Sequence, residues 1–130
     1  MKETHGKVLV TGSSGRVGRA LIPKLLERGY EVRALIHKRS LEGIVPKQVE
    51  VVQGNLTDYK TLVKAVEGVD MMCHLASLLP PGQSREDQTV YDNLSIFDLN
   101  VKGTFNLLEA SRTIKDLKKF VFASTDATYP

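Results

Sequence analysis

Apolar positions along the chain alternate between two kinds of spacing. Five short runs rich in apolar and β-branched residues, typical of buried strands, cover residues 7–11, 31–36, 49–53, 71–76 and 120–124. Between them, apolar residues recur at helical spacing, over residues 16–28, 59–67 and 91–113. Short strands separated by helices predict right-handed crossovers and a parallel sheet with helices on both faces. We therefore expect one three-layer αβα domain over residues 1–130, with a doubly wound sheet in strand order 3-2-1-4-5.

Local signals mark where the first two helices begin and end. Gly29 and Gly68 follow the helical patterns directly and are good C-terminal stops, and Asp58 is a suitable N-cap for the second helix. Pro23 lies inside the first helix, has no N–H and is expected to bend its first two turns.

The predicted helix over residues 91–113 carries apolar residues on two faces. One stripe contains Leu94, Phe97, Val101, Phe105 and Leu108, and the other contains Ile96, Leu99, Leu107, Ala110 and Ile114. A helix that is apolar nearly all round must be covered on both sides. One side would meet the sheet, and the other needs a missing helix or a partner subunit. We expect a homodimer through this helix, and a chain that is the N-terminal part of a longer protein whose C-terminal substrate region lies elsewhere.

Composition and charge narrow the possible partners. The 42% hydrophobic and 25% charged fractions are ordinary for a globular protein and exclude disordered and fibrous classes. The net charge is +3, but basic and acidic residues are interleaved, and the one locally basic stretch, 112–119, closes a helix. We expect no nucleic-acid partner. No run reaches the roughly 18 apolar residues of a membrane span, so no membrane partner is expected either.

A single cysteine excludes an internal disulfide and fits a reducing compartment, so we expect a cytoplasmic protein. That residue, Cys73, precedes His74, a pair that could suggest a metal site. Both lie within an apolar run and no second pair stands at ligand spacing, so a buried strand is favoured and no metal is expected.

A glycine-rich segment between the first predicted strand and the first predicted helix is the first candidate binding site along the chain. Gly12 suits a tight turn, Gly15 lets backbone approach a diphosphate, and Gly18 permits close packing of the helix on the strand. The N–H groups at the start of the helix supply donors and partial positive charge. A triphosphate-binding loop is excluded because no Lys-Ser or Lys-Thr follows at the required spacing. The segment predicts a Rossmann-like dinucleotide site.

Five motifs in order along the chain resemble the extended short-chain dehydrogenase/reductase family, the NAD(P)-dependent epimerases and dehydratases that act largely on nucleotide sugars. They are Thr11-Gly-Ser-Ser-Gly-Arg-Val-Gly18, Gly54-Asn-Leu-Thr-Asp58, His74-Leu-Ala-Ser77, Asn100-Val-Lys-Gly-Thr104 and Phe122-Ala-Ser-Thr-Asp-Ala-Thr-Tyr129. The resemblance implies a diphosphate site, an adenine site and a nicotinamide edge. The implied cofactor-binding residues are Gly12, Ser14, Gly15, Arg16, Val17, Gly18, Asn55, Leu56, Leu75, Ala76, Ser77, Asn100 and Ser124. Most relatives have Asp where Asn55 stands, so an adenine contact there requires the amide oxygen to face the base.

Charge after the second strand bears on the choice of cofactor. An acidic residue there would accept both ribose hydroxyls of NAD and repel a 2′-phosphate. This chain instead has Ile36 followed by His37, Lys38 and Arg39, which favour the 2′-phosphate of NADP. A solvated basic turn is the alternative. NADP is therefore the preferred cofactor, with NAD the second choice.

The family resemblance also implies catalytic residues. Thr125 matches the Ser or Thr that hydrogen-bonds the reacting oxygen, and a Tyr and Lys spaced as Y-x-x-x-K would move the proton. No Y-x-x-x-K occurs in these 130 residues, and Tyr129 matches a tyrosine that is not catalytic. Ala127 stands where sugar-nucleotide 4,6-dehydratases carry their second carboxylic residue, which favours an epimerase or reductase. The chain is thus expected to bind a dinucleotide without turnover.

The sequence bears on three further hypotheses. The same fold could serve as a non-catalytic NADP-sensing or scaffold module. A methyltransferase is disfavoured because the ribose-binding acid after the second strand is absent. The polar, proline-containing loop over residues 77–89 could be a substrate lid or a plain connection.

Overall fold

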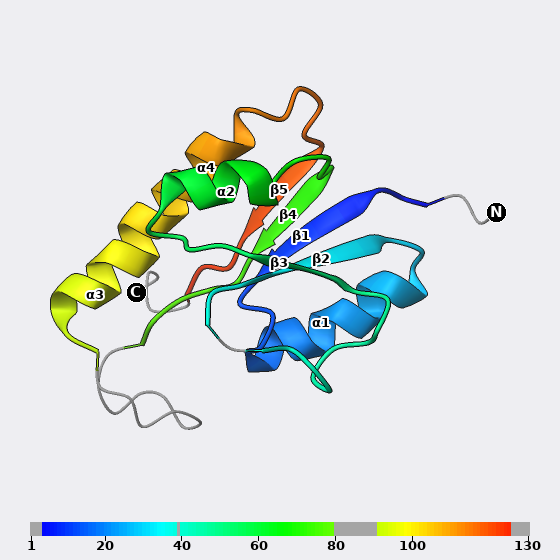
Figure 1. The fold of residues 1–130 in the computed structure, drawn as a ribbon, viewed down its shortest axis with the longest axis horizontal. Coiled ribbons are helices and arrows are strands. Elements are labelled where there is room, and N and C mark those ends of the chain that lie inside the picture. Colours follow the sequence, from blue (N-terminus) through cyan, green and yellow to red (C-terminus); the bar gives the residue numbers. More distant parts are fainter. Residues whose placement is uncertain (1–3, 39, 80–90, 126–130) are drawn as a thin grey trace.

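The computed structural model describes residues 4–38, 40–79 and 91–125. Its strands are β1 (Lys7–Thr11), β2 (Glu31–Ile36), β3 (Glu50–Gln53), β4 (Met71–His74) and β5 (Lys119–Phe122). Its helical segments are α1 (Arg16–Glu27), α2 (Tyr59–Ala65), α3 (Asn93–Phe97), η1 (Asp98–Gly103) and α4 (Thr104–Ser111). Figure 1 shows the strands as one twisted sheet with helices on either side. The predicted α/β alternation is confirmed.

The five strands are parallel and lie in the order β3-β2-β1-β4-β5, as predicted. Two apolar clusters make up the layers on either side. α1 contributes Ile22 and Leu25 to one cluster, whereas α2 and α4 contribute Leu62 and Leu107 to the other. The crossover from β3 through α2 to β4 brings the chain back past β2 and β1, so the strand order reverses beside β1. Parallel sheets bind ligands outside the carboxyl ends of the strands at such a point.

The predicted strands are correct in place but too long at three ends. Residue 49 precedes β3, β4 stops at His74 rather than at residue 76, and β5 stops at Phe122 rather than at residue 124. The cause at β4 is a side chain on the neighbouring strand. The Thr11 hydroxyl accepts hydrogen bonds from the N–H groups of Leu75 and Ala76, at 3.1 and 3.2 Å. These N–H groups therefore bond to a side chain rather than to the backbone of β1, which ends at Thr11.

Helix ends follow the expected chemistry. The Asp58 side chain accepts from the Lys60 N–H and caps α2, which ends at Ala65, two residues before the predicted end. Gly29 and Gly68 adopt positive φ angles of 80° and 69° in the turns that follow α1 and α2. Pro23 lies within a helix that runs from Arg16 to Glu27.

The predicted helix over residues 91–113 is present over residues 93–111, but it is not a regular α-helix throughout. Its first turn, α3, begins after Asp92, whose side chain accepts from the Ser95 N–H at 2.7 Å. A π-helical segment, η1, then separates α3 from α4, and α4 ends at Ser111. Hydrophobic spacing alone misses a π segment because such a segment adds only one residue to a turn.

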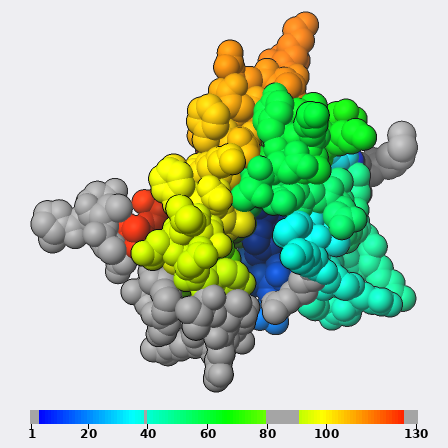
Figure 2. All heavy atoms as spheres, turned by 60° about the vertical axis from the view of Figure 1, so that its left-hand side comes forward, coloured from blue at the N-terminus to red at the C-terminus, as the bar shows by residue number. Residues whose placement is uncertain are grey.

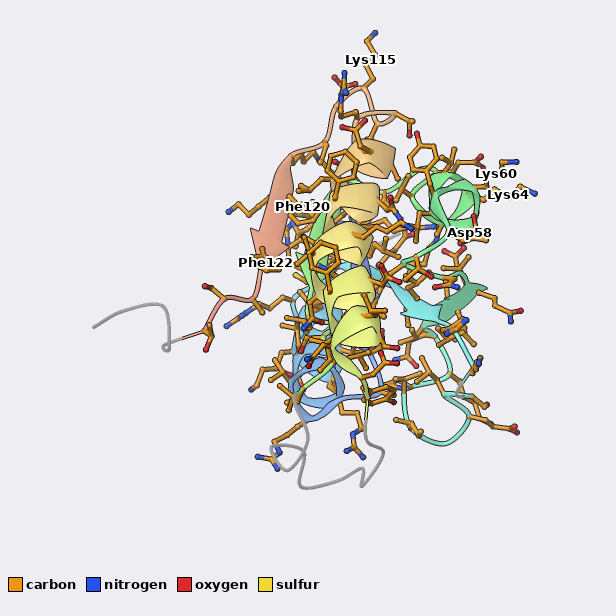
Figure 3. All side chains as sticks on the ribbon, turned by 90° about the vertical axis from the view of Figure 1, so that its left-hand side faces the viewer. Asp58, Lys60, Lys64, Lys115, Phe120 and Phe122 are labelled. Carbon is orange, nitrogen blue, oxygen red and sulfur yellow. The ribbon has the colours of Figure 1, made fainter. Side chains whose placement is uncertain are left out.

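The two apolar stripes of this helix differ in burial. Leu107 and Ala110 are fully buried against the sheet, and Leu99 and Ile114 pack beside them. The other stripe remains exposed in the described chain, with Phe105 60% and Leu94 76% accessible. Its remaining members, Phe97, Val101 and Leu108, are 44–56% accessible. In Figure 3 the helix lies between β5, which carries Phe120 and Phe122, and α2.

Candidate cofactor site

The glycine-rich turn between β1 and α1 has no room for side chains at two of its glycines. Gly12 has a φ angle of 70°, and a Cβ there would lie 2.8 Å from the backbone nitrogen of Ala76. At Gly18 a Cβ would collide with the carbonyl oxygen of Gly12, so this glycine serves packing of the helix on the turn rather than on the strand. The Gly15 N–H donates to the Gly12 carbonyl at 3.0 Å and closes the turn, and Gly15 is the N-cap of α1. Backbone thus forms the surface where a diphosphate would lie.

A cleft of about 460 Å³ lies over this turn. Figure 2 shows it as a hollow whose floor is formed by blue atoms of the N-terminal strand, between the cyan β2 region and the yellow-green segment near residue 95. One side, the β2–β3 wall, contains Leu35, Ile36, His37, Lys38, Gly54, Asn55 and Leu56. The other side, the β4 wall, contains Ala76, Ser77, Leu78, Leu79, Tyr91 and Leu99. A dinucleotide with its diphosphate on the glycine turn would place one half against each wall.

Buried side chains hold the floor in place. Ser13 is 1% accessible, and its hydroxyl donates to the Val10 carbonyl at 2.8 Å. Thr11, also buried, contacts the Nδ1 atom of His74 at 2.6 Å, and the Nε2 atom of the same ring lies 2.8 Å from the Thr104 hydroxyl. His74 therefore connects the end of β1 with the start of α4.

The direction of these hydrogen bonds fixes the tautomer of His74. Thr104 donates its hydroxyl proton to the Asn100 carbonyl at 2.7 Å, so its oxygen must accept from His74, which carries the proton on Nε2. The Nδ1 atom then accepts from the Thr11 hydroxyl, whose own oxygen accepts from Leu75 and Ala76. Burial lowers the pKa of His74 to about 4, so the ring is neutral at pH 7. This neutral, fully bonded ring agrees with the predicted buried strand position.

The loop after β3 forms part of the β2–β3 wall and is held by side chains from α2 and α4. The Thr61 hydroxyl accepts from the Asn55 N–H at 2.8 Å, and the Asn106 amide donates to the Leu56 carbonyl at 2.9 Å. The Asn55 side-chain oxygen accepts twice from Thr57, from its N–H and from its hydroxyl. Two bonds are the usual capacity of a carbonyl oxygen. That oxygen is therefore engaged within its own loop rather than directed at a base.

The basic turn after β2 begins at the same wall. His37 and Lys38 line the cleft, both are exposed, and the His37 carbonyl accepts from the Gln53 amide at 3.4 Å. The third predicted cation, Arg39, lies outside the described residues. Among the residues that line the described cleft there is no carboxylate.

Asn100 holds the opposite wall. Its side-chain oxygen accepts from the Leu78 N–H and its amide donates to the Leu78 carbonyl, both at 2.8 Å. Asn100 does not itself line the cleft but fixes a residue that does. Leu75 packs in the α1-side apolar cluster, behind the Ala76 and Ser77 edge.

The remaining predicted site residues lie around the cleft rather than in it. Arg16 and Val17 are exposed in the first turn of α1, and Val17 is 62% accessible. Ser124 and Thr125 are exposed after β5, outside the cleft lining, and Asp126, Ala127 and Tyr129 lie outside the described residues. Most of the loop over 77–89 is outside them too.

Sequence reasoning missed the supporting residues Ser13, Thr11, Thr104 and Asn106. Thr11 and Ser13 flank Gly12 in the turn, so their position in the sequence could have predicted a supporting role. Thr104 and Asn106 carried no such signal, because their contacts are with residues 30 to 50 positions away along the chain.

Comparison with known proteins shows which family the chain belongs to. The family model for the NAD-dependent epimerase/dehydratase family matches residues 8–130. The chain belongs to that family. This confirms the predicted resemblance. No helix in the described ranges is long and apolar enough to cross a membrane.

Relatives within this family have different activities. The chain is 40% identical over 124 residues to a 3β-hydroxysteroid dehydrogenase/Δ5→4-isomerase of Mycobacterium tuberculosis, covering 94% of this chain and 32% of the relative. It is 31% identical to a UDP-glucose 4-epimerase of Mycoplasma pneumoniae, covering 99% of this chain and 38% of the relative. The solved UDP-glucose 4-epimerase of Thermus thermophilus in complex with NAD is 34% identical, with a TM-score of 0.73, over 92% of this chain and 37% of that one. The chain thus spans about a third of the length of these proteins.

Proposed function

We propose that the chain is the NAD(P)-binding portion of an oxidoreductase or epimerase that takes hydride from a secondary alcohol carbon or returns hydride to the corresponding ketone carbon. The substrate would be a nucleotide sugar or a related alcohol or ketone. One observation carries the proposal: Gly12 lies in the floor of the cleft with a φ angle of 70° and no room for a Cβ against the Ala76 backbone. The floor therefore presents backbone beside the start of α1, the place where this fold binds a diphosphate.

NADP is the proposed preferred cofactor. The supporting observation is that His37 and Lys38 line the cleft directly after β2, where an NAD-binding protein of this fold would carry an acid. A 2′-phosphate beside Lys38 would gain charge-assisted hydrogen bonds. Titration of the purified protein with NADPH and NADH tests this preference. We expect tighter NADPH binding and a reversal in H37D, because the new carboxylate would repel the phosphate; equal affinities would contradict the proposal.

Thr125 is the proposed hydrogen-bond partner of the reacting oxygen. The Tyr and Lys of the Y-x-x-x-K motif do not occur within these 130 residues, so the chain alone should bind cofactor without turnover. The alternative is a non-catalytic NADP-sensing or scaffold module. The two differ in the full reading frame: a Tyr and a Lys at Y-x-x-x-K spacing there would favour the enzyme, and their absence would favour the module. Measurable turnover by the 130-residue chain would contradict the expectation of binding without turnover.

A steroid-like substrate is a second candidate, and one feature of the cleft favours it. The β4 wall carries Leu78, Leu79 and Leu99, an apolar surface suited to a ring system with few polar groups. Relatives with 3β-hydroxysteroid dehydrogenase names support the same class. Saturation-transfer NMR with NADPH present distinguishes the classes: contacts to a 3β-hydroxysteroid but not to UDP-glucose would favour the steroid, and the converse would favour the nucleotide sugar.

We also propose that the protein acts as a cytoplasmic homodimer. The exposed stripe on α3, η1 and α4 is apolar and continuous along the helix, which supports its burial against a second copy. The lone cysteine, Cys73, lies in β4 with a pKa raised by burial, which suits a thiol that stays reduced.

A further inference from the structure

The helix formed by α3, η1 and α4 contacts both walls of the cleft through two asparagines. Asn100 makes two hydrogen bonds to the Leu78 backbone, and Leu78 belongs to the β4 wall. Asn106 makes one to the Leu56 carbonyl, and Leu56 belongs to the β2–β3 wall. The two walls are therefore fixed to one helical element, through two asparagines that lie six residues apart in the sequence.

The π segment sets how these two asparagines are oriented relative to each other. At its end the Thr104 N–H donates to the Val101 carbonyl, while the Thr104 hydroxyl donates to the Asn100 carbonyl. The hydroxyl thus supplies the bond to residue 100 that the backbone N–H would make in a regular α-helix. Because one extra residue rotates the rest of the helix by roughly 100°, a regular helix would direct Asn106 elsewhere.

Gly103 lets the helix approach the loop closely enough for this contact. The residue is buried, and a Cβ there would lie 3.0 Å from the Leu56 Cβ. Leu56 is itself only 6% accessible, so it is held between the helix backbone and the rest of the apolar cluster. Its carbonyl then needs a donor, and the Asn106 amide provides one at 2.9 Å.

We propose that Asn106 is a positioning residue for the adenosine half of the cofactor, an inference that rests on the proposed dinucleotide function. In this fold the wall beside β2 takes the adenosine half, because the group after β2 meets its ribose. Asn106 holds Leu56 in that wall, and Asn100 holds Leu78 in the opposite one. Each asparagine thus holds one wall, so each affects the affinity for one half of the dinucleotide.

Binding of the two halves, measured separately, tests this inference. ADP-ribose probes the adenosine half and reduced nicotinamide mononucleotide probes the other. N106D keeps the shape of the side chain but removes the donor facing the Leu56 carbonyl, so we expect about tenfold weaker ADP-ribose binding and unchanged mononucleotide binding. N106S, which shortens the side chain without adding charge, should show the same selective loss.

N93D is the matched control, because Asn93 is exposed in α3 of the same helix and its side chain makes no hydrogen bond within the described chain. It should leave both affinities unchanged. Unchanged ADP-ribose binding in N106D and N106S, or equal weakening of both probes, would overturn the positioning role. Failure of the unmodified protein to bind either NADPH or NADH would instead overturn the proposed function, so the two outcomes are distinguishable.

Discussion

At the scale of single residues, His74 is a titratable group that the fold removes from water. It is 1% accessible, both ring nitrogens have hydroxyl partners, and burial lowers its pKa to about 4 from an ordinary value of 6.5. Between pH 4 and pH 6.5, His74 is therefore protonated in the unfolded chain but neutral in the folded chain. Stability is complete above pH 6.5 and decreases as the pH falls toward 4, by a maximum of roughly 3 kcal/mol from this residue.

Urea unfolding at pH 7 and pH 4.5 measures this loss. H74Q is the control, since an amide can donate to Thr104 and accept from Thr11 but does not titrate in this range. We expect the free energy of unfolding of the unmodified protein to fall more steeply with acid than that of H74Q. Identical slopes would show that His74 is not held neutral in the fold.

At the scale of elements, one hydroxyl links β4 and α4 by hydrogen bonds, beside their apolar packing. Thr104 accepts from His74 and donates to Asn100, so T104V leaves two partly buried polar groups without their partner. We expect a destabilisation of about 1–3 kcal/mol in urea unfolding. T113V is the matched control, because within the described chain the Thr113 hydroxyl, just after α4, bonds only the nearby Ala110 carbonyl. Equal effects of the two substitutions would contradict a role for Thr104 in joining helix and sheet.

The elements also show what sequence could and could not predict. Strand order and the glycine turn follow from hydrophobic runs and from Gly12, whose signals are local or periodic. The end of β4 at His74 depends on a threonine on another strand, and the π segment depends on contacts with two distant loops. Such features arise from tertiary hydrogen bonds, which a single sequence does not display.

At the scale of the whole molecule, the exposed stripe predicts self-association. F105E places a charge in the middle of the stripe, where the native side chain is 60% accessible, and should convert a dimer to a monomer in light scattering at micromolar concentration. K102E changes an exposed polar residue of the same segment and should leave the dimer intact. A monomer already present in the unmodified protein would contradict the proposed assembly.

The account as a whole depends on a dinucleotide lying across the glycine turn. The most direct measurement is calorimetric titration of NADPH into the unmodified protein, S14E and Q48E. Ser14 lines the cleft beside the diphosphate position, whereas Gln48 is exposed before β3 and outside the cleft lining. The account predicts that S14E loses binding by at least tenfold, because its carboxylate repels the diphosphate, and that Q48E binds like the unmodified protein. Equal binding by all three proteins would contradict it.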